Sequence, residues 1–179
     1  MFLMDEARFW CIGKQWWWRL VLLIGFAVIF VGLLKDPRSY NVFVMLNLPI
    51  HEIGHILFGW CGQLLAVAGG TITQLAAPLF GMWNFYQQKD FFAITLCFGW
   101  LSTNFFNVSY YIADARSMQL PLVSLGGGGD TIHDWNYLLG HMGLLPFDHC
   151  LAAGVWFLGV LSMVLCFLSG GWLLWKMAS

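Results

Sequence analysis

Apolar residues run along this chain in long blocks, and short clusters of charged residues separate the blocks. Each block is about as long as a helical crossing of a lipid bilayer, which takes roughly 20 residues. Because a lipid-exposed chain must satisfy its own backbone hydrogen bonds, each block predicts a helix. The sequence therefore predicts an all-α integral membrane protein, a single polytopic domain over residues 1–179. About five transmembrane helices are expected, over residues 16–34, 41–67, 70–88, 91–113 and 150–175.

The boundaries of the predicted spans follow from local signals. Residues 39–88 carry one formally charged residue, Glu52, and form too long a stretch for one crossing. Paired glycines end a helix cheaply, so the break is expected at Gly69 and Gly70. The span 16–34 reads as an anchor rather than a removed signal peptide, because no small-residue cleavage site follows it. Lys and Arg are evenly divided between the two sides, which leaves the orientation open.

Residues 114–149 differ in character from the rest of the chain, since most of the His residues and many Asp and Gly residues gather there. They predict a polar loop outside the membrane with a short helix over residues 133–144. Over the whole chain charged residues are scarce: 60% of the chain is hydrophobic, 18% aromatic and only 9% charged. A soluble domain carries about 25% charged residues, so a soluble globule is excluded, as is disorder.

Net charge and cysteine spacing exclude two further classes. The formal net charge of -1 gives no basic footprint for nucleic acid. The five cysteines lie far apart with no C-x-x-C pair, so neither a disulfide framework nor a cysteine zinc site is expected.

One motif carries chemistry: His51-Glu52-Ile53-Gly54-His55 is an H-E-x-x-H sequence inside an apolar stretch. On a helix, residues four apart share a face, so both imidazoles can bind one Zn²⁺ while Glu52 stands beside them as a general base. A carboxylate in the bilayer costs roughly 2.5–3.5 kcal/mol, which favours a functional role. The competing interpretation is a hydrogen-bonded cluster that joins helices, and it leaves the spacing of the two histidines unexplained. We therefore predict a zinc site.

A catalytic zinc site takes three protein ligands and keeps one position open for water. The favoured third ligand is Asp114, at the end of the fourth span, and the alternatives are His133 and Asp134. Two of these residues have competing structural interpretations. Asp114 can pair with Arg116, and Asp134 forms a helix-capping box with Thr131.

Depth along the predicted helices bears on this choice. At 1.5 Å per residue, His55 lies about 22 Å along its span and Asp114 about 34 Å along its own, so helix tilt or a break would have to bring them level. All three candidate ligands lie beyond the same membrane face, where water can enter. Asn104 and Asn107, in mid-span, are expected to contact substrate, to support the metal ligands, or to form hydrogen bonds between helices.

An H-E-x-x-H motif in a transmembrane helix, followed by an Asp at the end of a later span, resembles the intramembrane zinc metalloproteases of the site-2 protease type. The resemblance implies that the two histidines and the distant Asp bind zinc and that the Glu activates water. Residues 107–114 look like a divergent form of the family's Asn-to-Asp motif, with Ala115 in place of the usual Gly and without the usual prolines.

The chain looks still more like a group of small bacterial membrane proteins similar to site-2 proteases, over roughly residues 45–145. The segments that carry this likeness are His51 to His55, Gly69-Gly70 with Gln74 and Pro78, Tyr111 to Arg116, and His133-Asp134-Trp135 with Leu138-Leu139. The resemblance implies a location in the bacterial cytoplasmic (inner) membrane.

These patterns predict a zinc-dependent membrane metallopeptidase, an enzyme that hydrolyses a peptide bond of a transmembrane protein substrate within or at the surface of the lipid bilayer. The alternative is a non-catalytic subunit of a larger membrane complex, with or without zinc, which the small size and the many Trp and Phe residues favour. A metal transporter is disfavoured because no second cluster of ligands lines the other predicted spans.

Overall fold

The structure is a computed structural model that describes residues 2–121 and 132–179. Within these residues the chain is helical and contains no strand. The elements are α1 (Phe2–Cys11), α2 (Trp17–Lys35), α3 (Val42–Phe58), η1 (Gly59–Cys61), α4 (Gln63–Gln87), α5 (Phe91–Ala113), α6 (Asp134–His141), η2 (Leu145–Phe147) and α7 (Asp148–Ala178). Five segments are long and apolar enough to cross a membrane: α2, α3 with η1, α4, α5, and η2 with α7. The all-α class and the number of candidate spans, five, are thereby confirmed.

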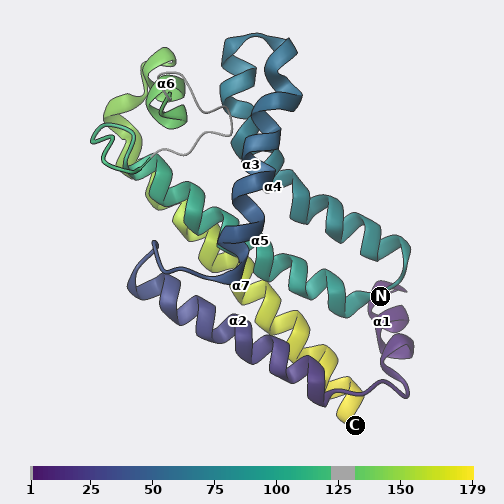
Figure 1. Ribbon diagram of the computed structural model, residues 1–179. Helices are drawn as coiled ribbons and strands as arrows, with labels where there is room; N and C mark the ends of the chain where they lie inside the picture. The colour runs from purple at the N-terminus through teal and green to yellow at the C-terminus, as the bar shows by residue number, and fades with distance from the viewer. Residues whose placement is uncertain (1, 122–131) are drawn as a thin grey trace.

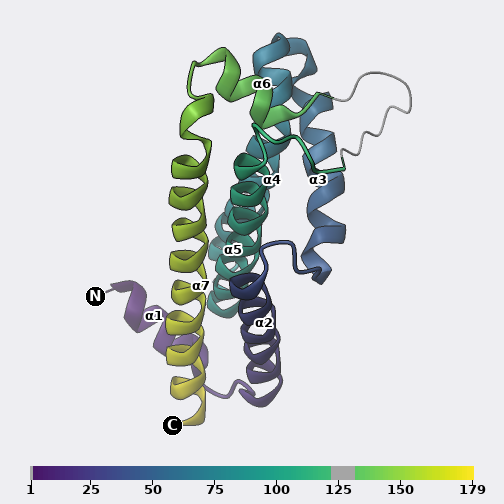
Figure 2. The same cartoon turned by 90° about the vertical axis from the view of Figure 1, so that its left-hand side faces the viewer.

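Helices α5 and α7 form the centre of the molecule and lie side by side along most of their length (Figures 1 and 2). Helix α2 lies along the half of this pair that includes the C-terminal end of α7, and α1 packs across that end. Helices α3 and α4 form a hairpin beside the other half of the pair. Helix α6 sits next to this hairpin, at the end of α5.

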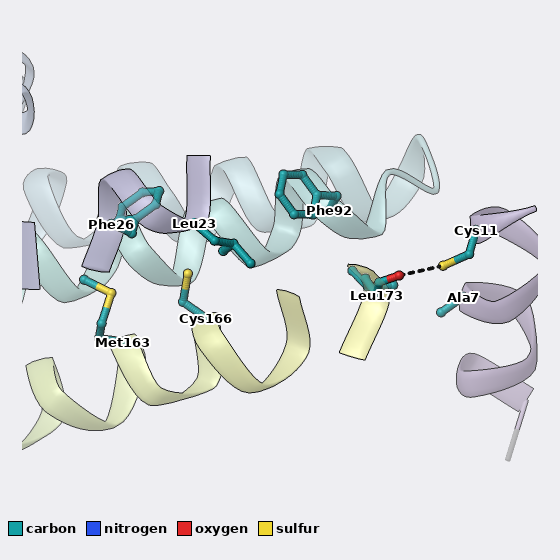
Figure 3. Packing of buried hydrophobic residues seen from close by; sticks show 8 residues of the cluster. All are labelled: Ala7, Cys11, Leu23, Phe26, Phe92, Met163, Cys166 and Leu173. Atoms are coloured by element: carbon teal, nitrogen blue, oxygen red, sulfur yellow. Dashed lines mark hydrogen bonds between the residues drawn. The ribbon is translucent and has the colours of Figure 1, made fainter. Parts of the chain in front are cut away.

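The largest buried apolar cluster lies where α1, α2, α5 and α7 meet (Figure 3). Its members are Ala7, Cys11, Leu23, Phe26, Phe92, Met163, Cys166 and Leu173. Gly170 lets α2 approach α7, since a Cβ at that position would lie 2.8 Å from the Leu23 side chain. The Cys11 thiol, 3.7 Å from the Leu173 carbonyl oxygen, fixes α1 on the end of α7. In a bilayer this close packing, rather than exclusion of water, holds helices together.

The turn between α3 and α4 falls at Gly62, not at the expected break near Gly69 and Gly70. Gly62 has φ +88°, in the region that a residue without Cβ adopts without strain. Gly69 and Gly70 instead lie inside α4. A Cβ on Gly69 would come within 2.5 Å of the Gly54 carbonyl oxygen of α3, so this glycine permits close contact of two helix backbones. The paired glycines therefore pack the hairpin and do not end a helix.

Candidate metal centre

The H-E-x-x-H motif lies in the second half of α3 and faces α4. One ligand atom from each of His51, Glu52 and His55 lies within 4.8 Å of the others. Gly70 of α4 makes room for the rings, since a Cβ there would lie 2.5 Å from Nε2 of His51 and 2.6 Å from Nε2 of His55. The close packing of the hairpin and the position of both imidazoles thus depend on the same pair of glycines.

The proton on the His55 ring is fixed by a backbone carbonyl. Nδ1 of His55 lies 2.8 Å from the Ala66 carbonyl oxygen, at the start of α4. A carbonyl oxygen can only accept, so Nδ1 carries a hydrogen and donates it. Nε2 of a neutral His55 therefore presents a lone pair.

The proton on the His51 ring is fixed by a chain of hydrogen bonds that begins at a proline. Pro78 has no N–H, so the carbonyl of Gln74 lacks its usual partner one turn later in α4. Nδ2 of Asn104, on α5, donates to that carbonyl at 3.0 Å. Oδ1 of Asn104 is then the acceptor for Nε2 of Gln74 at 3.2 Å. This turns Oε1 of Gln74 toward Nδ1 of His51 at 2.9 Å, so Nδ1 donates and Nε2 presents a lone pair.

Asp134, the first residue of α6, places its carboxylate against both rings. Its Oδ2 lies 3.0 Å from Nε2 of His51 and 3.3 Å from Nε2 of His55. Burial raises the pKa of Asp134, but hydrogen bonds and positive charge from the two imidazoles, when these are protonated, lower it by more, so the net pKa is below its ordinary value. When both rings are neutral and their Nδ1 atoms donate elsewhere, the two Nε2 lone pairs both face the Asp134 carboxylate. Only positive charge stabilises this arrangement: a second proton on the rings, or a metal cation.

The separations between the Asp134 oxygen and the two ring nitrogens are near those of a zinc site. Zinc binds His nitrogen at roughly 2.0–2.1 Å and carboxylate oxygen at roughly 2.0–2.2 Å in tetrahedral sites, which separates the ligand atoms by about 3.3–3.5 Å. The separations of 3.0 and 3.3 Å between Asp134 and the two rings are close to this range. Two imidazoles and one carboxylate also form one of the donor sets of catalytic zinc, with a fourth position left for water.

Contacts with the end of α5 hold α6 in place. The backbone N–H of Asp134 donates to the Tyr111 hydroxyl at 3.1 Å. Two residues later, Nδ2 of Asn136 donates to the Ala115 carbonyl oxygen at 2.7 Å. These bonds position the Asp134 carboxylate over α3, although its helix lies far away in the sequence.

Asp114, the favoured third ligand in the sequence, lies instead at the C-terminus of α5 with its oxygens otherwise engaged. It accepts from the Ser117 hydroxyl at 2.5 Å, from the backbone N–H groups of Gln119 and Leu120 at 3.0 Å each, and from Nε2 of His133 at 3.2 Å. Burial raises the pKa of Asp114, but hydrogen bonds from these four donors lower it by more, so its net pKa is below the ordinary value. The reason is local, since a carboxylate at a helix end is satisfied by the turn that follows.

The remaining candidates also have structural partners. His133 is the N-cap of α6, where its Nδ1 accepts from the backbone N–H of Asn136 at 3.2 Å. Thr131, the other half of the expected capping box, lies outside the described residues. Arg116 pairs with Asp148 at 2.6 Å and not with Asp114. Of the three residues considered for the third ligand, the structure brings Asp134 to the two histidines.

The mid-span asparagines form hydrogen bonds between helices, which is one of the three roles expected for them. Both accept from Nε2 of Gln74, Asn104 at 3.2 Å and Asn107 at 3.0 Å. Through Gln74 they also support His51. Reasoning from the sequence gave Gln74 no role at the site. The signal was a carboxamide in mid-span, which is costly unless bonded, four residues before a proline.

Comparisons of the chain with models of protein families, with curated proteins and with solved structures find no match. What the site can do chemically therefore follows from its own geometry. Two imidazole lone pairs and a carboxylate converge, and a second carboxylate, Glu52, lies within reach of them. Such a set can hold a divalent cation beside a base.

Proposed function

We propose that this protein is a zinc-dependent membrane metallopeptidase in which His51, His55 and Asp134 bind Zn²⁺ and Glu52 is the general base. The observation that carries the proposal is that Nε2 of both imidazoles faces the Asp134 carboxylate, at 3.0 and 3.3 Å, in a site whose other ring nitrogens already donate to protein oxygens. A hydrogen-bonded cluster would instead need at least one imidazolium between α3 and α6.

The chemistry divides between the ion and the chain. When bound, zinc lowers the pKa of a water molecule toward ~7 and polarises a carbonyl oxygen. Glu52 accepts the proton from the attacking water and returns it to the leaving nitrogen. General acid–base catalysis of this kind contributes roughly 10²–10⁴-fold to the rate. Gln74 and the Ala66 carbonyl keep both imidazoles in the tautomer that presents Nε2.

The substrate class follows from where the motif lies. Helix α3 is one of the five segments apolar enough to cross a membrane, and the motif occupies its second half. A membrane protein is therefore the proposed substrate, cut within the bilayer or at its surface. The resemblance of the sequence to site-2 proteases supports the same reaction, and a bacterial inner membrane is the location that this resemblance favours.

A second candidate function is a non-catalytic subunit of a membrane complex. Large aromatic side chains on exposed helix surfaces favour it, among them Trp60, which is 94% exposed at the tip of the α3–α4 hairpin. Such aromatic groups also occur wherever helices face lipid head groups, so they support assembly less strongly than the three-atom convergence supports a metal.

The chain offers a matched pair for testing the base, since its two glutamates are Glu52 and Glu6. Zinc-loaded protein in detergent is assayed for hydrolysis of casein and of a pool of quenched fluorescent peptides. We expect Glu52→Gln to keep one zinc per chain and to lose hydrolysis by about 10²–10⁴-fold, because no base remains. Glu6→Gln, in α1 beside Lys89, should keep the full rate. Equal rates in the wild type and Glu52→Gln would contradict the proposal.

A further inference from the structure

A cavity of about 150 Å³, lined by both polar and apolar residues, lies where the loop between α2 and α3 meets α5. Its polar lining includes Ser39, Asn41, Asn47, Thr103, Asn107 and Tyr110, and the lining contains no carboxylate. The proposed metal centre does not require this cavity.

Asn47 of α3 is 5% exposed, yet only one side of its carboxamide is used by the protein. Its Oδ1 accepts from the Trp100 indole at 2.7 Å. An indole nitrogen can only donate, so the orientation of the carboxamide is certain and Nδ2 points away from Trp100. Within the described part of the chain, Nδ2 of Asn47 has no hydrogen-bond acceptor, and Asn47 is one of the residues that line the cavity.

Asn107 repeats this arrangement from α5. Its Oδ1 accepts from Nε2 of Gln74 at 3.0 Å, and among the described residues its Nδ2 has no acceptor; Asn107 also lines the cavity. Arg38 also lines the cavity, but its guanidinium is paired with Asp36 at 3.1 Å. Two neutral donors and a neutralised cation suit a ligand with neutral acceptor oxygens better than they suit an anion.

The cavity lies close to the proposed metal centre. Asn47 precedes His51 by four residues on the same face of α3, which is about 6 Å along the helix axis. An extended polypeptide advances roughly 3.3 Å per residue, so this distance corresponds to about two residues of substrate. Asn107 is joined to His51 through Gln74. A chain held at the metal centre would therefore pass these two carboxamides within about two residues.

We propose that this cavity binds an unwound, extended segment of the polypeptide substrate, whose main-chain carbonyls accept hydrogen bonds from Asn47 and Asn107. In a helix those carbonyls are bonded internally, and within a membrane an unwound carbonyl must find another donor. The two carboxamides supply such donors next to the site of cleavage. This inference rests on the proposed function.

The test uses zinc-loaded, full-length protein and three probes. Acetohydroxamate reports on the metal alone, and two tripeptide hydroxamates, with the chelating group at the C-terminus or the N-terminus, add an extended chain on either side. We expect Asn47→Asp, which keeps the acceptor for Trp100 and removes the donor, to weaken binding of one tripeptide probe about tenfold. Its affinity for acetohydroxamate and its zinc content should not change.

Asn41→Asp is the matched control, because Asn41 lines the same cavity but its Nδ2 already donates to the Ser39 carbonyl oxygen at 3.1 Å. It introduces the same charge and should change no affinity by more than about twofold. Asn107→Asp, in α5, gives a second and independent variant with the same expected loss.

The failures of the two proposals can be told apart. If the wild type does not bind acetohydroxamate, the metal centre and with it the substrate cavity are wrong. If all probes bind the wild type, and Asn47→Asp and Asn107→Asp bind them equally well, the cavity inference alone is overturned. It is also overturned if phosphatidylglycerol added to the micelles abolishes the effect of Asn47→Asp, because the cavity would then hold a lipid head group.

Discussion

Among the described residues, histidine and aspartate side chains meet at two places, which share the same residue types and differ in where the ring hydrogens lie. In the first, Nδ1 of His133 accepts from a backbone N–H, so Nε2 carries the hydrogen and donates to Asp114 at 3.2 Å. In the second, Nδ1 of both His51 and His55 donates, so the Nε2 lone pairs face Asp134 at 3.0 and 3.3 Å. A neutral imidazole completes the first contact. The second is complete only with a positive charge, either a second proton on a ring or a bound cation.

When Nε2 of a histidine faces a carboxylate, the hydrogen-bond partner of Nδ1 decides whether Nε2 donates a hydrogen or presents a lone pair. His133 caps helix α6, and this fixes its ring as a donor to the carboxylate. His51 is held by Gln74 and His55 by the Ala66 carbonyl, and both acceptors leave Nε2 without a hydrogen. A neutral ring therefore satisfies the first contact, whereas the second requires an added proton or, in the proposed function, a metal cation.

Substitution of Gly70 should have the largest effect on zinc binding. It should disrupt the contact of His51 and His55 with Asp134 and leave the contact of His133 with Asp114 intact. A Cβ at Gly70 would lie 2.5 and 2.6 Å from the two Nε2 atoms, so Gly70→Ala must displace both imidazoles. We expect its zinc affinity to fall by at least about 10²-fold, more than for most changes outside the ligands. Competition with a chromogenic chelator measures it. Gly25→Ala, at a helical glycine with open space around it, is the control and should bind zinc normally.

Removal of the Gln74 carboxamide should weaken the second contact without destroying it. Gln74→Leu leaves Nδ1 of His51 without its acceptor and frees the ring to take the other tautomer, so we expect a loss of zinc affinity of about 10–100-fold. The same chelator competition applies. Gln63→Leu, at the exposed start of α4, makes the same chemical change away from the site. Equal affinities in these two variants would show that Gln74 does not position His51.

Much of this architecture could be predicted from the sequence, because it depends on local patterns. Runs of apolar residues gave five helices, and the spacing in H-E-x-x-H put His51 and His55 on one face. The prediction that the helix breaks at the paired glycines was wrong for a physical reason. A glycine that ends a helix and a glycine that lets two helices touch look alike in sequence, and only the neighbouring Gly54 distinguishes them.

The partner of the two histidines could not be predicted in the same way. If both helices are straight, Asp114 lies about two helical turns farther along its span than His55 lies along its own. The sequence does not show where residues 114–149 come back into contact with the helices. Asp134 reaches α3 because Tyr111 and Ala115 hold α6 against the end of α5. Such a contact depends on tertiary packing.

The contact of His133 with Asp114 can be tested separately through the pH dependence of the stability of the fold, where the expected effect is the smallest. Burial raises the pKa of Asp114, but the hydrogen bonds from Ser117, Leu120, Gln119 and His133 bring the net pKa below its ordinary value. A carboxyl group with a lowered pKa in the folded state stabilises the fold above its unfolded pKa of about 3.9 and loses that contribution as the pH falls through the folded pKa.

Unfolding of metal-free protein in detergent should therefore become easier below about pH 4, and Asp114→Asn should reduce this dependence. Measurement between pH 2 and 6 with a chelator present excludes any contribution of zinc. The same dependence in the wild type and in Asp114→Asn would show that this carboxylate does not stabilise the fold.

Zinc binding by Asp134→Asn and Asp114→Asn, measured side by side with the wild type, tests most directly whether Asp134 binds a metal together with His51 and His55. Both substitutions remove one carboxylate from a His–Asp contact. We expect one zinc per chain in the wild type and in Asp114→Asn, and an affinity lower by about 10³-fold in Asp134→Asn, which loses a ligand. Wild-type affinity in Asp134→Asn, or loss of zinc in Asp114→Asn alone, would contradict the assignment of Asp134 as the third ligand.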